Sequence, residues 1–180
     1  MLNIIKKTMM LKTESKTVNS GYSHLAKIFH WGFVVLFAYG IFKQIEDIKQ
    51  LEDLALLKFE IYFAVIFILL LLIRFVYMKR TQRSSLPPDT PKAQKTLAKL
   101  VHYGMYAGMV SIALSGLIIG CFYWVGLKGG FIINFLIIWH EASVSTVYWL
   151  IGLHLVGAIF HRFKNDGVWE SMVPILRSKK

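Results

Sequence analysis

The chain has 180 residues, enough for one compact unit, and its single cysteine, Cys121, excludes an intrachain disulfide and an iron–sulfur cluster. Hydrophobic residues make up 56% of the chain and the mean hydropathy is +0.53, which excludes an ordinary soluble domain. The net charge is +11, and the basic residues lie beside and between the apolar blocks. This placement indicates an orientation signal in a membrane and argues against nucleic-acid binding.

Four apolar blocks predict four transmembrane helices, because each can supply the roughly twenty residues that cross a hydrocarbon core. The predicted spans cover about residues 25–44, 59–78, 100–125 and 139–162. They form a transmembrane domain over residues 25–163, between an N-terminal tail at 1–24 and a C-terminal tail at 164–180. The predicted fold class is therefore an all-α, polytopic membrane four-helix bundle.

Three segments beside the spans also carry structural predictions. The first tail lacks a small-residue cleavage site after an apolar core, so we expect it to be retained and not cleaved as a signal peptide. Residues 84–91 contain three prolines and predict a linker that divides the chain into two hairpins. Residues 131–138 precede the fourth span, and we expect them to lie in the membrane interface or in a short separate turn.

Loop charges predict the orientation of the bundle in the membrane. Basic residues outnumber acidic ones before the first span, between spans two and three, and after the fourth span. The loop after the first span instead has three lysines against four acids, Glu46, Asp47, Glu52 and Asp53. Since positively charged loops stay in the cytoplasm, both termini are predicted to be cytoplasmic.

Histidines inside the spans are the main candidates for chemistry, because a buried ionisable side chain in a membrane is costly and needs a partner. His140 and His154 are fourteen residues apart, which is about 21 Å along a helix and within roughly 40° of the same face. His30 in the first span lies at the depth of His154 near the cytoplasmic side, so these two could sandwich one haem. No histidine occurs at the depth of His140, toward the outer side. Hydrogen bonds between helices are the alternative role for these imidazoles.

The absence of a C-x-x-C-H motif excludes covalent attachment, so any haem would be held by side chains alone. Several stretches resemble the bacterial cytochrome b561 family, a grouping that includes the membrane cytochrome b subunits of nickel–iron hydrogenases. They are Ile28-Phe29-His30-Trp31, Trp139-His140-Glu141, Gly152-Leu153-His154 with His161 beyond it, Asp166-Gly167 and Met172-Val173-Pro174. The similarity extends over about residues 22–175. It implies four helices in a bacterial inner membrane, two b haems and electron exchange with quinone.

The chain departs from the family pattern in the second span. The family's second-helix histidine lies fourteen residues before an arginine, and the position fourteen residues before Arg74 is Glu60. A carboxylate is an uncommon axial ligand of haem iron. Three outcomes are open: no outer haem, an outer haem bound by His140 alone, or a His140/Glu60 pair.

Three further side chains carry alternative roles. Arg74 either snorkels toward lipid headgroups or pairs with a propionate of the inner haem. His161 lies two helical turns after His154 and either faces headgroups or bonds a quinone carbonyl. His102 opens the third span and is a second candidate for the quinone site, or a spare ligand.

The leading functional hypothesis is a membrane b-type cytochrome that moves electrons between a donor and the quinone pool through non-covalently bound haem. One branch of the family oxidises superoxide and reduces ubiquinone, so superoxide is a candidate donor. The alternative is a cytochrome b membrane-anchor subunit of a larger respiratory enzyme such as a hydrogenase. A non-redox transporter or assembly factor is a third hypothesis. The expected partners are membrane lipid, quinone, and either a second copy of the chain or a redox subunit. Whether the chain is an oxidoreductase by itself stays open.

Overall fold

The computed structural model describes residues 21–43, 45, 47–82 and 84–173, and every regular element in them is helical. Most of the two predicted tails lies outside the described residues, as do Glu46 of the acidic loop and Pro174 of the family-like motif. The elements are α2 (His24–Phe42), the 3₁₀ helix η1 (Ile48–Glu52), α3 (Leu54–Thr81), α4 (Lys92–Trp124), α5 (Phe131–Lys164) and α6 (Val168–Met172). Four of these helices are long and apolar enough to cross a membrane, which confirms the all-α class and the four spans.

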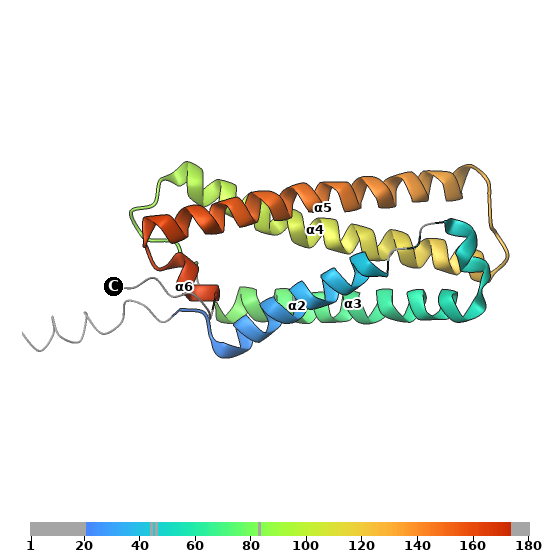
Figure 1. Ribbon diagram of the computed structural model, residues 1–180, viewed down its shortest axis with the longest axis horizontal. Coiled ribbons are helices and arrows are strands. Elements are labelled where there is room, and N and C mark those ends of the chain that lie inside the picture. The colour runs from blue at the N-terminus through green and yellow to red at the C-terminus, as the bar shows by residue number, and fades with distance from the viewer. Residues whose placement is uncertain (1–20, 44, 46, 83, 174–180) are drawn as a thin grey trace, which may run out of the picture.

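The four long helices run along one axis, with α2 and α3 on one side and α4 and α5 on the other (Figure 1). Close packing follows chain order: α3 packs on α4 and α4 on α5, whereas α2 packs on α3 much less closely. We call the end of the bundle where α2 begins and α5 ends the α6 end. The opposite end, which holds the loop after α2, is called the η1 end.

Helices α3, α4 and α5 begin before the spans predicted for them. The Asp53 side chain accepts a hydrogen bond from the backbone N–H of Ala55, so α3 begins before Lys58. Pro91 precedes the first residue of α4, where its fixed φ suits a helix start, and that helix therefore includes a basic turn. Residues 131–138 form the first two turns of a continuous α5.

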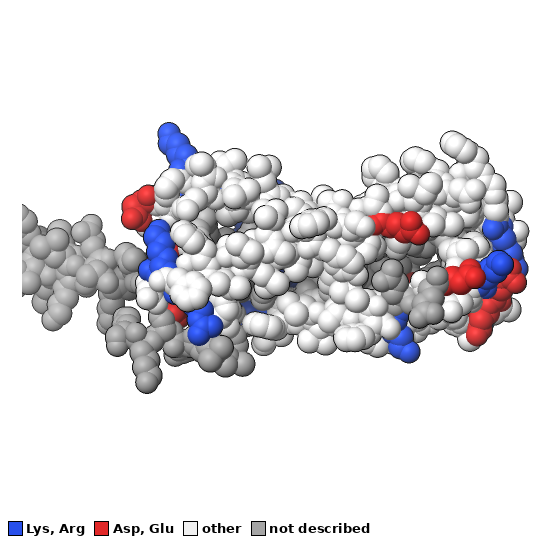
Figure 2. Space-filling view, turned by 45° about the horizontal axis from the view of Figure 1, so that its top comes forward, with Lys and Arg blue, Asp and Glu red and all other residues white. Residues whose placement is uncertain are grey.

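The distribution of side chains fits a protein whose solvent is lipid. Large apolar residues are exposed along the helices; for example Val35, Ile138 and Val156 are each about two-thirds exposed. Figure 2 shows charged side chains toward the two ends of the visible face and a mostly uncharged stretch between them. The chain is therefore a multi-pass membrane protein, with one cluster of buried apolar side chains midway along the bundle and a second at the η1 end.

Small residues let α4 and α5 approach closely. A Cβ atom added at Gly108 would overlap Cγ2 of Val147, the side chain that is fully buried in the core. At Gly116, an added Cβ would lie 3.3 Å from Cε1 of His140. Both glycines belong to α4, and because they have no side chain, α5 can pack closely against this face of α4.

Candidate functional site

Three histidines from three helices meet near the α6 end of the bundle. The rings of His30 on α2 and His154 on α5 have centroids 6.2 Å apart, with an angle of 60° between their planes. The ring of His102 on α4 packs edge-on against His154, with centroids 5.0 Å apart. Counting residues along the spans predicts that His30 and His154 lie at the same depth, and in the structure their rings lie close together.

Arg74 of α3 reaches into the same cluster. Its Nη2 lies 3.3 Å from Nδ1 of His30, and its guanidinium carbon lies 5.3 Å from the ring centroids of Phe33 and Tyr106. Its Nε is buried without a hydrogen-bond partner among the described residues. The side chain therefore points into the bundle and does not extend toward lipid headgroups. A buried guanidinium with an unused donor is suited to an anionic group such as a carboxylate.

His102 is tied to its own helix. Its Nδ1 lies 2.6 Å from the carbonyl oxygen of Ala98, one turn earlier, so Nδ1 carries the proton and donates it. Nε2 is then the unprotonated nitrogen. His102 thus presents a fixed ring to His154.

The donor set at the α6 end fits a b-type haem. A metal–imidazole bond is about 2.0–2.1 Å long, so two rings on opposite sides of one metal have centroids roughly 6 Å apart. The separation of His30 and His154 agrees with that spacing. The unused Nε of Arg74 is compatible with pairing to a haem propionate.

The η1 half of the bundle has a different arrangement, in which His140 is bound to α4. The hydroxyl of Ser115 donates to the carbonyl oxygen of Ser111 at 2.7 Å, so its oxygen accepts from Nδ1 of His140 at 3.0 Å. Among the described residues, no hydrogen bond or ion pair joins His140 to Glu60, and no second imidazole contacts His140. Whether His140 and Glu60 act as a ligand pair stays a prediction.

A serine network continues from this point along the interface between α4 and α5. Ser111 bonds the hydroxyl of Ser143 at 2.8 Å and accepts from Nε1 of Trp139 at 2.8 Å. Ser143 in turn donates to the carbonyl oxygen of Trp139. These serines thus hydrogen-bond α4 to α5, and Ser115 positions the ring of His140.

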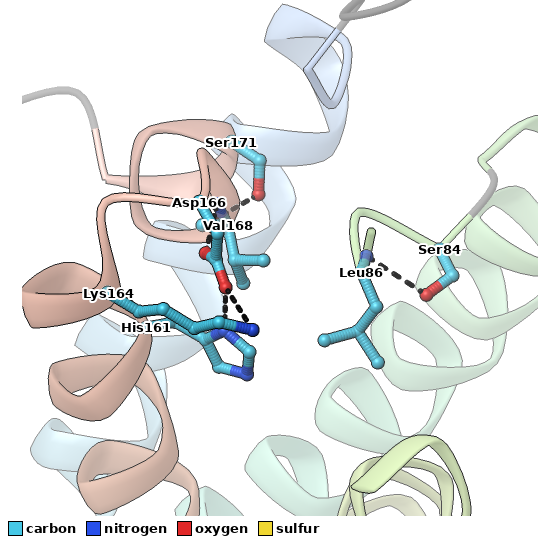
Figure 3. A network of polar contacts seen from close by, with 7 residues as sticks. All are labelled: Ser84, Leu86, His161, Lys164, Asp166, Val168 and Ser171. Atoms are coloured by element: carbon cyan, nitrogen blue, oxygen red, sulfur yellow. Dashed lines mark hydrogen bonds and ion pairs between the residues drawn. The ribbon is translucent and has the colours of Figure 1, made fainter. Parts of the chain in front are cut away.

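A buried ion pair at the end of α5 is a feature that the sequence analysis missed. Oδ2 of Asp166 lies 2.6 Å from Nδ1 of His161, and the two side chains are 9% and 12% exposed (Figure 3). The pairing needs a reversal of the chain between the two residues, which Asn165 provides by adopting a left-handed conformation with φ 53°. The only sequence signal for this reversal is the Asn-Asp-Gly run that follows the helix.

The corner formed by α5 and α6 is attached to the helix that carries His30. Nε1 of Trp31, the neighbour of His30 in the sequence, donates to the carbonyl oxygen of Met172 at 3.2 Å. This bond places the corner beside the cluster of three histidines. His30, His102, His154, Arg74 and His161 therefore gather at the α6 end, whereas His140 lies toward the η1 end.

Comparison with known proteins adds one finding to this geometry. Residues 21–174 match the sequence model of a family described as "Prokaryotic cytochrome b561". No curated protein and no solved structure matches the chain.

Proposed function

We propose, because the chain belongs to the prokaryotic cytochrome b561 family, that it is a cytochrome of the bacterial inner membrane that transfers electrons between a donor and quinone. The family implies haem-mediated electron transfer by a multi-pass membrane protein. The proposal adds the electron donor, quinone as the partner in electron transfer, and the residues that bind the haem. One observation carries them: the imidazole rings of His30 and His154 have centroids 6.2 Å apart.

His30 and His154 are proposed as the axial ligands of one haem b. When bound, haem b supplies a one-electron couple whose potential depends on its ligands, its burial and the charges near it. The chain would contribute two imidazoles and a guanidinium from Arg74 for a propionate. His102 would hold the ring of His154 in place through its edge-on contact at 5.0 Å.

A single haem per chain is proposed, in contrast to the two that the resemblance implies. The support is the ligand set in the η1 half, where His140 has a serine as its partner and Glu60 occupies the aligned second position. A carboxylate is a hard ligand and a poor match for low-spin haem iron. Without a metal, Glu60 must be protonated or paired in its half-buried place on α3.

Quinone is proposed to bind at the α6 end, near His161, with the α6 end facing the cytoplasm. The excess of basic residues between spans two and three and after the fourth span supports this orientation. His102 is the alternative quinone contact, but its Nδ1 is already used within α4 and its ring packs on His154. Superoxide is the first donor to test, because one branch of the family oxidises it.

The decisive test is a spectrum of the purified protein with quantified haem. A reduced-minus-oxidised spectrum should show a low-spin b-type haem that quinone reoxidises, with one haem per chain. A protein without haem would refute the proposal. Copurification with a soluble redox subunit would instead support the membrane-anchor alternative.

A further inference from the structure

We propose that Asp166 is a positioning residue for His161, which holds the imidazole in the tautomer that exchanges protons with bound quinone through Nε2. This inference rests on the proposed quinone site and adds the residue that orients its proton donor. The contact between Asp166 and His161 was not expected from the sequence, and neither residue is a proposed haem ligand.

All the described neighbours of the Asp166 carboxylate are hydrogen-bond donors or cations. Oδ2 faces Nδ1 of His161 at 2.6 Å and Nζ of Lys164 at 3.7 Å, and Oδ1 accepts from the backbone N–H of Val168 at 3.3 Å. An ionised carboxylate only accepts hydrogen bonds, so the proton between the two residues is on Nδ1 of His161. In the neutral imidazole, Nε2 is then the nitrogen without a proton.

The backbone holds this arrangement before any substrate arrives. Asn165 ends α5 in a left-handed conformation, and Gly167 follows with φ 83°, a value that favours glycine. Between them, Asp166 is turned back over the last turns of α5. Ser171 closes the corner by donating to the carbonyl oxygen of Val168 at 2.6 Å. The orientation of His161 is therefore built into the fold.

The second ring nitrogen of His161 is the one left to meet a quinone at the proposed site. Figure 3 shows the second ring nitrogen pointing away from Asp166. His161 follows His154 by seven residues, which is about 10 Å along the helix and on nearly the same face. The bond from Trp31 to Met172 keeps the corner against α2, beside His30. Nε2 is thus the protonatable atom of the corner that lies nearest in depth to the histidine cluster.

The proton balance follows from this geometry. Reduction of a quinone to a quinol takes up two electrons, supplied one at a time from haem b, and two protons. After Nε2 of His161 has taken a proton from water, the Nε2–H bond would break as an O–H bond forms at the quinone oxygen that faces it, and the other quinone oxygen would take its proton from water. Nδ1–H stays bonded to Asp166, so the imidazole is left in the tautomer that takes the next proton from water at Nε2. Oxidation of a quinol runs the same transfers in reverse.

Asp166→Asn is the informative substitution, because an amide has one oxygen and cannot accept from both Val168 and His161. We expect unchanged haem content and an unchanged spectrum after chemical reduction. The kcat of quinone reduction should fall about 10–100-fold, the usual loss when a group that orients an imidazole is removed. The KM for quinone should change little, and the solvent deuterium isotope effect on kcat should rise. A wild-type kcat with an unchanged isotope effect would overturn the proposal.

Two controls separate orientation from general loosening of the corner. Lys164→Gln removes the other cation near the carboxylate, and Ser171→Ala removes a bond that closes the corner without touching the ion pair. Both should keep the wild-type kcat. An equal loss in Ser171→Ala would show that the corner acts through its shape alone, and would overturn the role of Asp166.

His161→Gln separates failure of this inference from failure of the proposed function. Wild-type quinone turnover in that variant would remove the quinone site from His161. Loss in His161→Gln together with normal turnover in Asp166→Asn would reject only the positioning role. If Asp166→Asn loses haem, infrared difference spectra of histidine-labelled wild-type protein decide. A band of the Nδ1–H tautomer that His161→Gln lacks supports the proposal, and an Nε2–H band overturns it.

Discussion

The imidazole rings of His30 and His154 lie 6.2 Å apart between centroids, although one residue is on the first long helix and the other on the last. Neither is near the other in sequence, and their helices are not packed closely along their length. Two imidazoles from distant helices at that separation call for an explanation, and a shared metal between them is the one proposed.

Removal of either ring is therefore expected to remove the haem. His30→Ala and His154→Ala should each bind little haem and lose the low-spin spectrum, because one imidazole alone cannot complete six-coordination. His102→Ala is the matched control, since it removes a neighbouring ring but neither proposed ligand. It should retain haem. A normal low-spin spectrum in His154→Ala would reject the assignment.

Arg74 is expected to set the haem potential through its charge. Arg74→Gln should lower the midpoint potential by roughly 60 mV, which corresponds to ~1.4 kcal/mol for one electron. The reason is that a nearby cation favours the reduced form, which carries one positive charge fewer. Arg74→Lys keeps the charge, so the midpoint potential should fall less in this variant. Equal potentials in wild type and Arg74→Gln, measured by redox titration, would place the guanidinium away from the haem.

We expect the η1 half of the wild-type protein to bind no haem, and we expect one substitution to create a haem site there. Wild type should contain one haem per chain and show no spectral change with carbon monoxide. Glu60→His restores the imidazole that the family pattern has at this position, and should add a second, low-spin haem. A carbon monoxide shift in wild type would instead reveal a five-coordinate haem on His140. Two low-spin haems in wild type would mean that another ligand faces His140.

The orientation in the membrane can be tested with reporters at both ends of the bundle. A reporter fused after Lys180 should be active only in its cytoplasmic form, because the basic segments flank the α6 end. A reporter inserted after Lys128, between α4 and α5, should be active only in its periplasmic form. The opposite pair of results would invert the bundle and move the quinone site to the periplasmic side.

Close packing of α4 on α5 predicts a difference between two glycines. Gly108→Ala should destabilise the protein by about 1–3 kcal/mol, because the new methyl group overlaps Val147 in a filled core. Gly152→Ala has open space around the added atom and should be nearly neutral. Thermal unfolding in detergent measures both. Equal stability of the two variants would show that the α4–α5 interface accommodates the added methyl group without loss of stability.

The sequence predicted the depth of the histidines because depth depends only on counting residues along a helix. It could not predict the contact of His102 with His154, since that depends on how α4 is rotated about its axis against α5. It also missed the pairing of Asp166 with His161, which depends on one left-handed residue after the helix. Hydropathy placed the start of the second span at 59, whereas hydrogen bonding starts α3 at Leu54.

Helix α2 packs less closely on the bundle than the other long helices do, so a bound haem would help to hold it in place. Figure 1 shows α2 inclined to the other long helices, and it contacts α5 through ring pairs, His30 with His154 and Phe37 with Tyr148. A group bonded to both histidines would add a link between α2 and α5, whose direct contacts are few. Maturation would then have an order: α3, α4 and α5 assemble first, and α2 docks when the haem is captured. Unloaded protein should accordingly expose α2 to quality-control proteases, so that the cell keeps only chains able to carry electrons.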